Sequence, residues 1–218
     1  MTDIKSLHDG FSLSTHRVAA KGARKGGVVV IQEIFGISPH IRAMCDAFAA
    51  RGYEALAPSL FDRIERGFQA GMDEAGMQKA RGAIQNVNWD EVAGDVQAAI
   101  DALAPPVMIT GFCYGGAVAW LAAQRCSGLS AASGFYGRFI TALLASPPQV
   151  PIILHFGSKD AGIPLTEVDK IRAAYPDAPI HLYDAGHGFC REGSRDFDAP
   201  SRDLALQRTF DLFDQHAN

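Results

Sequence analysis

The sequence lacks a cluster of basic residues. Its 218 residues include 20 Lys and Arg against 24 Asp and Glu, which gives a formal net charge of −4. The one local basic group, Lys21, Arg24 and Lys25, is interspersed with glycine and is interpreted as a solvated turn. Because phosphates bind to clustered basic faces, the sequence predicts no nucleic-acid partner.

Long apolar runs are also missing. No stretch approaches the roughly 20 apolar residues of a membrane-spanning helix. The first ten residues are polar and contain no apolar core of a secretion signal. These absences lead us to expect a cytoplasmic protein that has no membrane partner.

Cysteines are few, and none of them stand at the spacing of a metal site. Cys45, Cys113, Cys126 and Cys190 form no C-x-x-C pair and no zinc-type cluster with histidine. In a reducing compartment they are expected to be free thiols. We therefore expect no metal and no organic cofactor. Three of the four cysteines are interpreted as packing residues, whereas Cys113 stands in a distinctive motif.

Short apolar runs alternate with helical patterns, and no repeat or linker divides the chain. Residues 28–31 form a β-branched run typical of a strand buried on both faces. Further strands are predicted at 53–56, 107–110, 129–135, 151–156 and 180–183, with helices at 40–51, 70–86, 90–103, 116–124, 165–175 and 199–215. This alternation predicts one α/β domain over residues 1–218, with a mainly parallel sheet and helices on both faces. Ligands of such sheets gather at the carboxyl ends of the strands.

Gly111-Phe112-Cys113-Tyr114-Gly115 follows one of these strands and precedes a helix. The pattern matches a nucleophile elbow in which cysteine replaces serine. The flanking glycines allow a tight turn, and the start of the helix favours a thiolate at Cys113. The backbone N–H of Tyr114 could then donate to a developing oxyanion. The alternative interpretation is a glycine-rich turn with a buried cysteine.

Asp160 and His187 also follow predicted strands, in Gly-Ser-Lys-Asp and Gly-His-Gly. The chain order of nucleophile, acid and histidine is that of an α/β-hydrolase. In this interpretation His187 exchanges a proton with Cys113 and later activates water, while Asp160 orients the imidazole. Asp160 could instead be a turn or cap residue, and Asp184 is a rival acid.

Glu33 follows the predicted strand at residues 28–31 and is an unusual carboxylate in an apolar setting. Burial of an unpaired carboxylate is costly, so we expect Glu33 to have a partner or a raised pKa. One candidate partner is the thiol of Cys113. The alternative is an arginine near the edge of the sheet.

Together these segments resemble the dienelactone hydrolase family, the carboxymethylenebutenolidases. The resemblance extends from Val28 to the final helix. The motifs that carry it are Gln-Glu-Ile-Phe-Gly at 32–36, Gly-x-Cys-x-Gly-Gly at 111–116, Gly-x-x-Asp at 157–160 and Gly-His-x-Phe-x-Arg at 186–191. Members of this family open a dienelactone, a product of catechol ring cleavage, so the resemblance implies a hydrolase with an α/β-hydrolase fold.

The resemblance also implies roles for individual residues. Cys113, His187 and Asp160 form the catalytic triad, and Glu33 holds the resting thiol and helps to generate the thiolate. The backbone N–H groups of Ile34 and Tyr114 form the oxyanion hole. A separate set of residues is expected to contact the substrate. Arg191 binds the carboxylate of the substrate, Phe35 is a neighbour of the site, and Arg81 is a third candidate.

One departure from the family concerns a second arginine expected in the helix before residue 90. Alignment places Met77 there, while Arg81 falls where a family tyrosine is expected. The anion-binding pair is therefore rebuilt or absent. Other aromatic residues near strand ends, including Tyr136, are interpreted as core.

We therefore predict a monomeric enzyme that cleaves a small-molecule ester or lactone through a cysteine acyl-enzyme. A thioesterase or a cysteine peptidase could use the same triad. A redox-sensing or ligand-binding protein that uses Cys113 without turnover is an alternative of another class.

Overall fold

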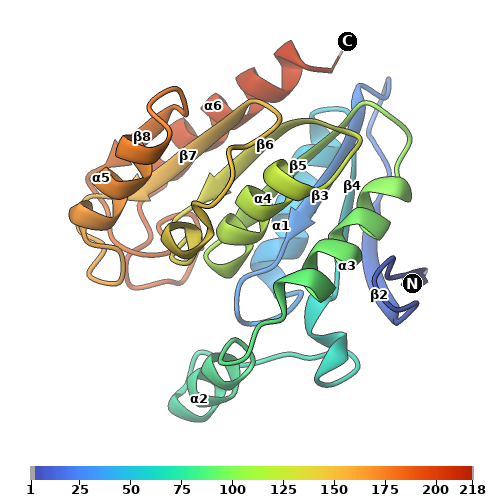
Figure 1. Ribbon diagram of the computed structural model, residues 1–218, viewed down its shortest axis with the longest axis horizontal. Helices are drawn as coiled ribbons and strands as arrows, with labels where there is room; N and C mark the ends of the chain where they lie inside the picture. The colour runs from blue at the N-terminus through green and yellow to red at the C-terminus, as the bar shows by residue number, and fades with distance from the viewer. Residues whose placement is uncertain (1–2, 218) are drawn as a thin grey trace.

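A central sheet of eight strands organises the structure, a computed structural model that describes residues 3–217 (Figure 1). The strand order is β1-β2-β4-β3-β5-β6-β7-β8. Pairs β1–β2 and β2–β4 are antiparallel, and every pair from β4 to β8 is parallel. The strands are β1 (Asp3–Lys5), β2 (Ser12–Val18), β3 (Gly26–Ile31), β4 (Tyr53–Pro58), β5 (Val107–Phe112), β6 (Leu129–Phe135), β7 (Ile152–Gly157) and β8 (Ile180–Tyr183).

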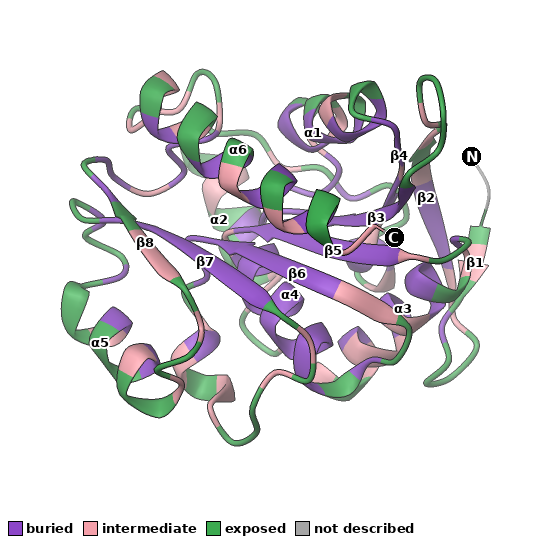
Figure 2. Ribbon diagram, turned by 90° about the horizontal axis from the view of Figure 1, so that it is seen from above, coloured by how far each residue is buried: buried purple, intermediate pink, exposed green. Residues whose placement is uncertain are grey.

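Helices cover both faces of this sheet. They are α1 (Pro39–Ala50), α2 (Glu74–Gly82), α3 (Trp89–Asp101), α4 (Tyr114–Arg125), α5 (Leu165–Ala174) and α6 (Ala199–Gln215), with short 3-10 helices η1 (Leu60–Arg63) and η2 (Ile140–Leu143). Figure 2 shows α1 and α6 on one face and α3, α4 and α5 on the other. Helix α2 stands away from the sheet (Figure 1). No helix within residues 3–217 has the length and apolarity to cross a membrane.

The predicted parallel sheet is confirmed, whereas the amino-terminal edge was missed. All six residues of β3 are buried, as expected for a strand covered on both faces. The polar sequence of β1 and β2 carries no strong strand signal. Strand β2 forms by pairing with β4, and β1 forms by pairing with β2. Their formation therefore depends on a long-range contact rather than on local pattern.

The predicted helix at 70–86 was too long at both ends. Helix α2 begins at Glu74 because the Asp73 carboxylate accepts a hydrogen bond from the Gly76 N–H at 2.9 Å. The helix ends at Gly82. In α3 the Asn88 side chain caps the helix by accepting from the N–H groups of Asp90 and Glu91.

Glycine allows α4 to lie unusually close to the sheet. A Cβ on Gly115 would lie 2.6 Å from the carbonyl oxygen of Ile31 and 2.7 Å from that of Gln32. A Cβ on Gly111 would overlap the carbonyl oxygen of Gly115. Backbone atoms cannot move aside cheaply, so these two positions set the distance between β5, β3 and the start of α4.

We expect Gly115→Ala to lower the free energy of unfolding by at least about 1–3 kcal/mol, because the added methyl group would overlap backbone carbonyl oxygens. Gly82→Ala is the matched control, since nothing lies within 4 Å of its added Cβ. The control should change stability by less than about 1 kcal/mol. Urea unfolding of both variants checks the prediction, and equal stabilities would contradict it.

Candidate active site

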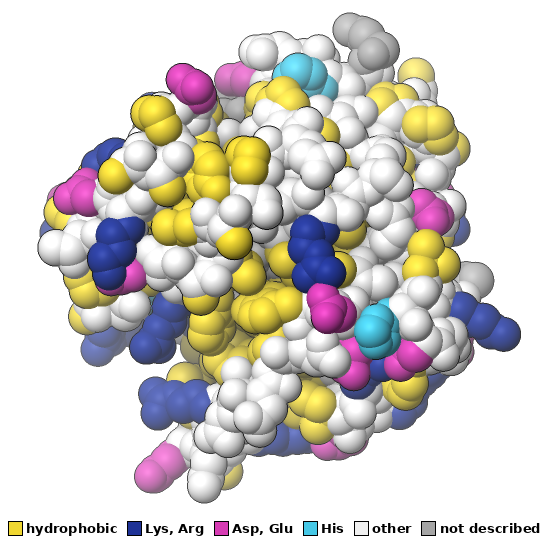
Figure 3. Space-filling view, in the orientation of Figure 1, with side chains coloured by type: hydrophobic (Ala, Val, Ile, Leu, Met, Phe, Trp, Pro, Cys, Tyr) yellow, Lys and Arg dark blue, Asp and Glu magenta, His cyan; other side chains and the backbone are white. Residues whose placement is uncertain are grey.

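The carboxyl ends of β3, β5, β7 and β8 bring the predicted site residues to one edge of the sheet. Glu33 follows β3, Cys113 follows β5, Asp160 follows β7 and His187 follows β8. Parallel strands direct the loops after them toward the same edge, which explains why residues distant in sequence meet there. Figure 3 shows hydrophobic side chains gathered in a hollow between α2 and the body of the molecule.

Cys113 occupies the sharp turn between β5 and α4. Its backbone has φ 56° and ψ −114°, a conformation that residues other than glycine rarely adopt. Its N–H donates to the Phe135 carbonyl at 3.0 Å, which ties the turn to β6. The thiol is half-buried at the amino end of a 12-residue helix. The N–H groups in the first turn of such a helix, including that of Tyr114, have no carbonyl partner within the helix.

His187 connects the thiol with a buried carboxylate. Its Nε2 lies 3.2 Å from Cys113 Sγ, and its Nδ1 lies 2.6 Å from Asp160 Oδ2. The other Asp160 oxygen accepts from the Gly162 N–H at 2.8 Å. The rival acid, Asp184, is exposed and pairs with Lys159. The structure therefore places Asp160, and not Asp184, beside the imidazole.

These contacts favour the protonated form of His187. Burial by itself would lower the pKa of the imidazole, but the hydrogen bonds to Asp160 and Cys113 outweigh it and raise the pKa to about 10. At neutral pH the ring can therefore donate from both nitrogens, to the carboxylate on one side and to the sulfur on the other.

Glu33 has a different partner from the expected thiol. Its Oε1 accepts from an Arg191 guanidinium nitrogen at 2.8 Å, and the two side chains are 0% and 14% exposed. Among residues 3–217, the other oxygen of Glu33 has no hydrogen-bond partner. The expected resting contact with Cys113 is thus replaced by an ion pair, because a buried carboxylate requires a compensating charge.

The residues expected to surround the site differ in their placement. Phe35 lies under the Arg191 guanidinium, 5.0 Å from ring centroid to carbon, and both residues line a cavity of about 540 Å³. Ile34 is buried, and the buried Tyr114 ring packs on Phe61 and Trp89. The structure brings Phe35 and Arg191 together beside Glu33.

Arg81 does not join these residues. It is exposed in the last turn of α2, and no hydrogen bond, ion pair or ring contact in the described chain links it to them. Met77 is half-buried on the same helix and packs against the core. The structure therefore gives the expected role of Arg81 in substrate binding no support.

Two residues at the site were not predicted. Tyr136 is fully buried with φ 38°, and its ring packs edge-on against His187 at 5.1 Å. It directly follows β6, so the rule that sites form at strand ends could have identified it. His40, at the start of α1, lines the cavity with Arg191 and had no sequence signal of its own.

No group of three metal-binding side chains occurs within residues 3–217. The sheet order, the antiparallel edge and the nucleophile turn after β5 are those of an α/β-hydrolase fold.

Comparison with known proteins places the chain within this class. The sequence profile of the dienelactone hydrolase family matches residues 13–217, so the chain belongs to that family and is a hydrolase of the dienelactone hydrolase type. A relative from Azospirillum brasilense, provisionally named carboxymethylenebutenolidase, is 33% identical over 99% of both chains. A relative of the same name from Escherichia coli K12 is 33% identical and covers 87% of this chain and 76% of its own length.

Solved structures agree in fold. A provisionally named dienelactone hydrolase from Klebsiella pneumoniae has a TM-score of 0.84 and 26% identity and covers 97% of both chains. A dienelactone hydrolase-like phosphotriesterase from metagenomic libraries has a TM-score of 0.79 at 20% identity, with coverage of 99% of this chain and 97% of its own. The second likeness shows the fold alone.

Arg191→Met should lower the free energy of unfolding by about 3–5 kcal/mol, because it leaves the Glu33 carboxylate buried without a counter-charge. Adding Glu33→Gln should restore part of this loss, since no uncompensated charge then remains. Arg172→Met, which breaks an exposed pair with Asp169, should change stability by less than about 1 kcal/mol. Urea unfolding of the four proteins tests this, and an absence of rescue in the double variant would contradict it.

The raised pKa of His187 also predicts a pH dependence of stability. The Cys113→Ala protein has no thiol at this position whose titration could contribute. In its folded state the His187 imidazole should stay protonated above pH 6.5 because of its hydrogen bond to Asp160. The unfolded chain loses that proton near pH 6.5, so stability should fall as pH rises, by at most about 1.4 kcal/mol per unit. Stability below pH 6.5 should retain the full contribution.

The control is the Cys113→Ala, His187→Gln protein, which has no imidazole at this position. Thermal unfolding between pH 6 and pH 10 compares the two proteins. Parallel stability curves over that range would show that the His187 pKa is not raised by Asp160.

Proposed function

We propose that this protein hydrolyses small carboxylate-bearing esters or lactones through an acyl-enzyme on Cys113. The observation that carries the proposal is the continuous chain of contacts from Cys113 through His187 to Asp160 at the amino end of α4. A nucleophile, a base and a carboxylate that orients the base are the parts required for acyl transfer.

In the first half of the reaction the Cys113 sulfur attacks the substrate carbonyl as the thiolate, while its proton is held on His187 Nε2. The carbonyl oxygen becomes negative and accepts hydrogen bonds from the backbone N–H groups of Tyr114 and Ile34. When the tetrahedral species collapses, the bond to the alcohol breaks, and the imidazolium gives its proton to that alcohol. Asp160 keeps the ring aligned and stabilises its cation.

In the second half water replaces the alcohol. Once the sulfur is acylated it no longer carries a charge that holds the proton on His187, so the imidazole can act as a base. His187 removes a proton from water, the hydroxide attacks the thioester, and the carboxylic acid leaves as the thiol forms again. Water enters and the acid leaves, so the cycle needs no cofactor.

The Glu33–Arg191 pair supports the assignment of a carboxylate-bearing substrate. A substrate carboxylate that reaches Arg191 competes with Glu33 for the guanidinium. Glu33, released from its ion pair, is then a free carboxylate beside the site. The names of the relatives point to the same substrates, because carboxymethylenebutenolidases act on dienelactones, which arise during the breakdown of aromatic compounds.

The first test measures turnover of p-nitrophenyl acetate and cis-dienelactone by the native protein and by Cys113→Ala. Cys113→Ala should lower kcat by a factor of at least about 10³, since the acyl acceptor is gone. Cys126→Ala is the matched control, because this thiol is buried and contacts the Ala93 carbonyl on α3. The control should retain native turnover, and full activity of Cys113→Ala would refute the mechanism.

The alternatives make different predictions in the same assay. A thioesterase or a peptidase would turn over an acyl-thioester or a peptide in preference to both esters and would still require Cys113. A redox sensor would oxidise at Cys113 without turning over any acyl substrate. Turnover of the simple ester alone would keep the mechanism and exclude dienelactone as the substrate.

A further inference from the structure

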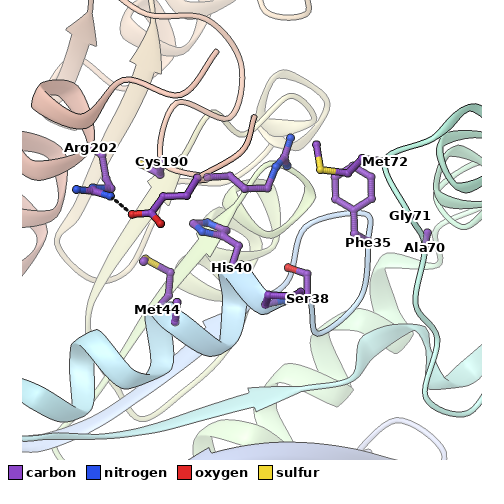
Figure 4. A pocket seen from close by; sticks show the side chains of 13 residues that line it. Phe35, Ser38, His40, Met44, Ala70, Gly71, Met72, Cys190 and Arg202 are labelled. Carbon is purple, nitrogen blue, oxygen red and sulfur yellow. Dashed lines mark hydrogen bonds and ion pairs between the residues drawn. The ribbon is translucent and has the colours of Figure 1, made fainter. Parts of the chain in front are cut away.

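A cavity beside the proposed catalytic residues has no part in the reaction described above. It occupies about 540 Å³ between the Phe35 loop, the start of α1, residues 70–72 and residues 190–192. Figure 4 shows Phe35 and Met72 on one side and Met44, His40 and Arg202 on the other. Its volume lies within the range of about 300–1,000 Å³ typical of small-molecule sites.

The cavity adjoins the proposed active site at Arg191 and Phe35. Arg191 lines it and also donates to Glu33, and Phe35, which lies under that guanidinium, directly follows Ile34 of the proposed oxyanion hole. Cys190, another lining residue, is buried beside Arg191. A substrate whose carbonyl reaches Cys113 can therefore extend into this space.

Most of the cavity wall is apolar. It is formed by Phe35, Pro39, Ala43, Met44, Ala70 and Met72. Met72 is 53% exposed and lies on the same side of the cavity as Phe35 (Figure 4). Methionine adapts its shape to different apolar partners, so such a wall suits a flexible chain or a ring.

One end of the cavity is polar but already balanced in charge. Arg202 pairs with Glu192 at 2.6 Å and with Asp203 at 2.8 Å, and the dashed line in Figure 4 marks the first of these pairs. Arg191 pairs with Glu33. The proposed reaction assigns Arg191 to the substrate carboxylate, so a second anionic group would have to break one of the Arg202 pairs, which disfavours it.

His40 supplies a hydrogen-bonding atom that takes no part in these ion pairs. His40 is 9% exposed and lines the cavity. Its ring packs edge-on against Phe112, with 5.0 Å between the ring centroids. Within residues 3–217 its Nε2 has no hydrogen-bond partner. Burial lowers the pKa of His40, so the ring is neutral. The N–H groups at the start of α1, whose cap is Ser38, lie at the same end.

We propose that this cavity is a specificity subsite for the non-reacting part of the substrate, and that it takes an apolar chain or ring bearing an uncharged oxygen that bonds to His40. This inference rests on the proposed ester hydrolysis and adds the size and polarity of the substrate. The preferred substrate is therefore an ester or lactone that carries an additional apolar group.

Ala43→Phe tests the apolar part of the subsite. Ala43 is exposed on α1 and lines the cavity, so a phenyl group there fills space without disturbing the core. The ratio of kcat/KM for p-nitrophenyl heptanoate to that for p-nitrophenyl acetate should fall at least about tenfold, because several CH₂ groups lose their apolar surroundings. Ala50→Phe, at an exposed position on the same helix outside the cavity, should keep the native ratio.

His40→Leu tests the polar part. The substrates are p-nitrophenyl heptanoate and isosteric esters in which oxygen replaces one CH₂ of the chain, at each position in turn. The native protein should prefer the oxygen at one position, and His40→Leu should reduce that preference about fivefold through loss of one hydrogen bond. A native ratio in Ala43→Phe, or no change of preference at any position in His40→Leu, would overturn the corresponding part of the proposal.

Binding separates failure of the subsite from failure of the proposed reaction. If the protein shows no Cys113-dependent turnover, the hydrolytic mechanism is rejected but the subsite is not. Calorimetry with 4-phenylbutanamide needs no turnover: the native protein and Ala50→Phe should bind it, and Ala43→Phe should bind it at least about tenfold more weakly. No binding by the native protein, or equal binding by the two variants, would reject the subsite.

Discussion

Close approach of backbone at Gly111 and Gly115 is the constraint on which the site depends. A Cβ at either position would overlap backbone atoms of the turn or of β3, so the first turn of α4 can lie against the sheet only because both are glycine. This approach places Cys113 in a strained conformation, with its sulfur at the amino end of α4 and within 3.2 Å of His187. The geometry of the Cys113 turn is thus a consequence of sheet–helix packing.

Two ionic arrangements lie side by side at this edge of the sheet. In one, His187 is held between Asp160 and the thiol, and in the other the buried Glu33 is neutralised by Arg191. A buried charge that loses its partner is strongly unfavourable, so each of the two arrangements depends on both of its members.

Much of the fold could be predicted because its signals are local. The β-branched run of β3, the alternation of strands and helices, and glycine around Cys113 depend on sequence periodicity and backbone freedom. Strands β1 and β2 could not be predicted in this way, since their polar residues form strands by pairing with the sheet edge. The position of Arg81 could not be predicted for a similar reason, because the placement of α2 depends on its packing and on the Asp73 cap.

The sequence by itself determined the order of the strand-end segments and therefore which residues could meet: Cys113, Asp160, His187 and Glu33 each follow a strand of one parallel sheet. Only the tertiary structure decided their partners. It selected Asp160 over Asp184 for the imidazole, and Arg191 over the thiol for Glu33. It also formed the cavity at His40, because a cavity arises between segments that no local pattern relates. Distances between side chains are set by packing, which the linear order of residues does not contain.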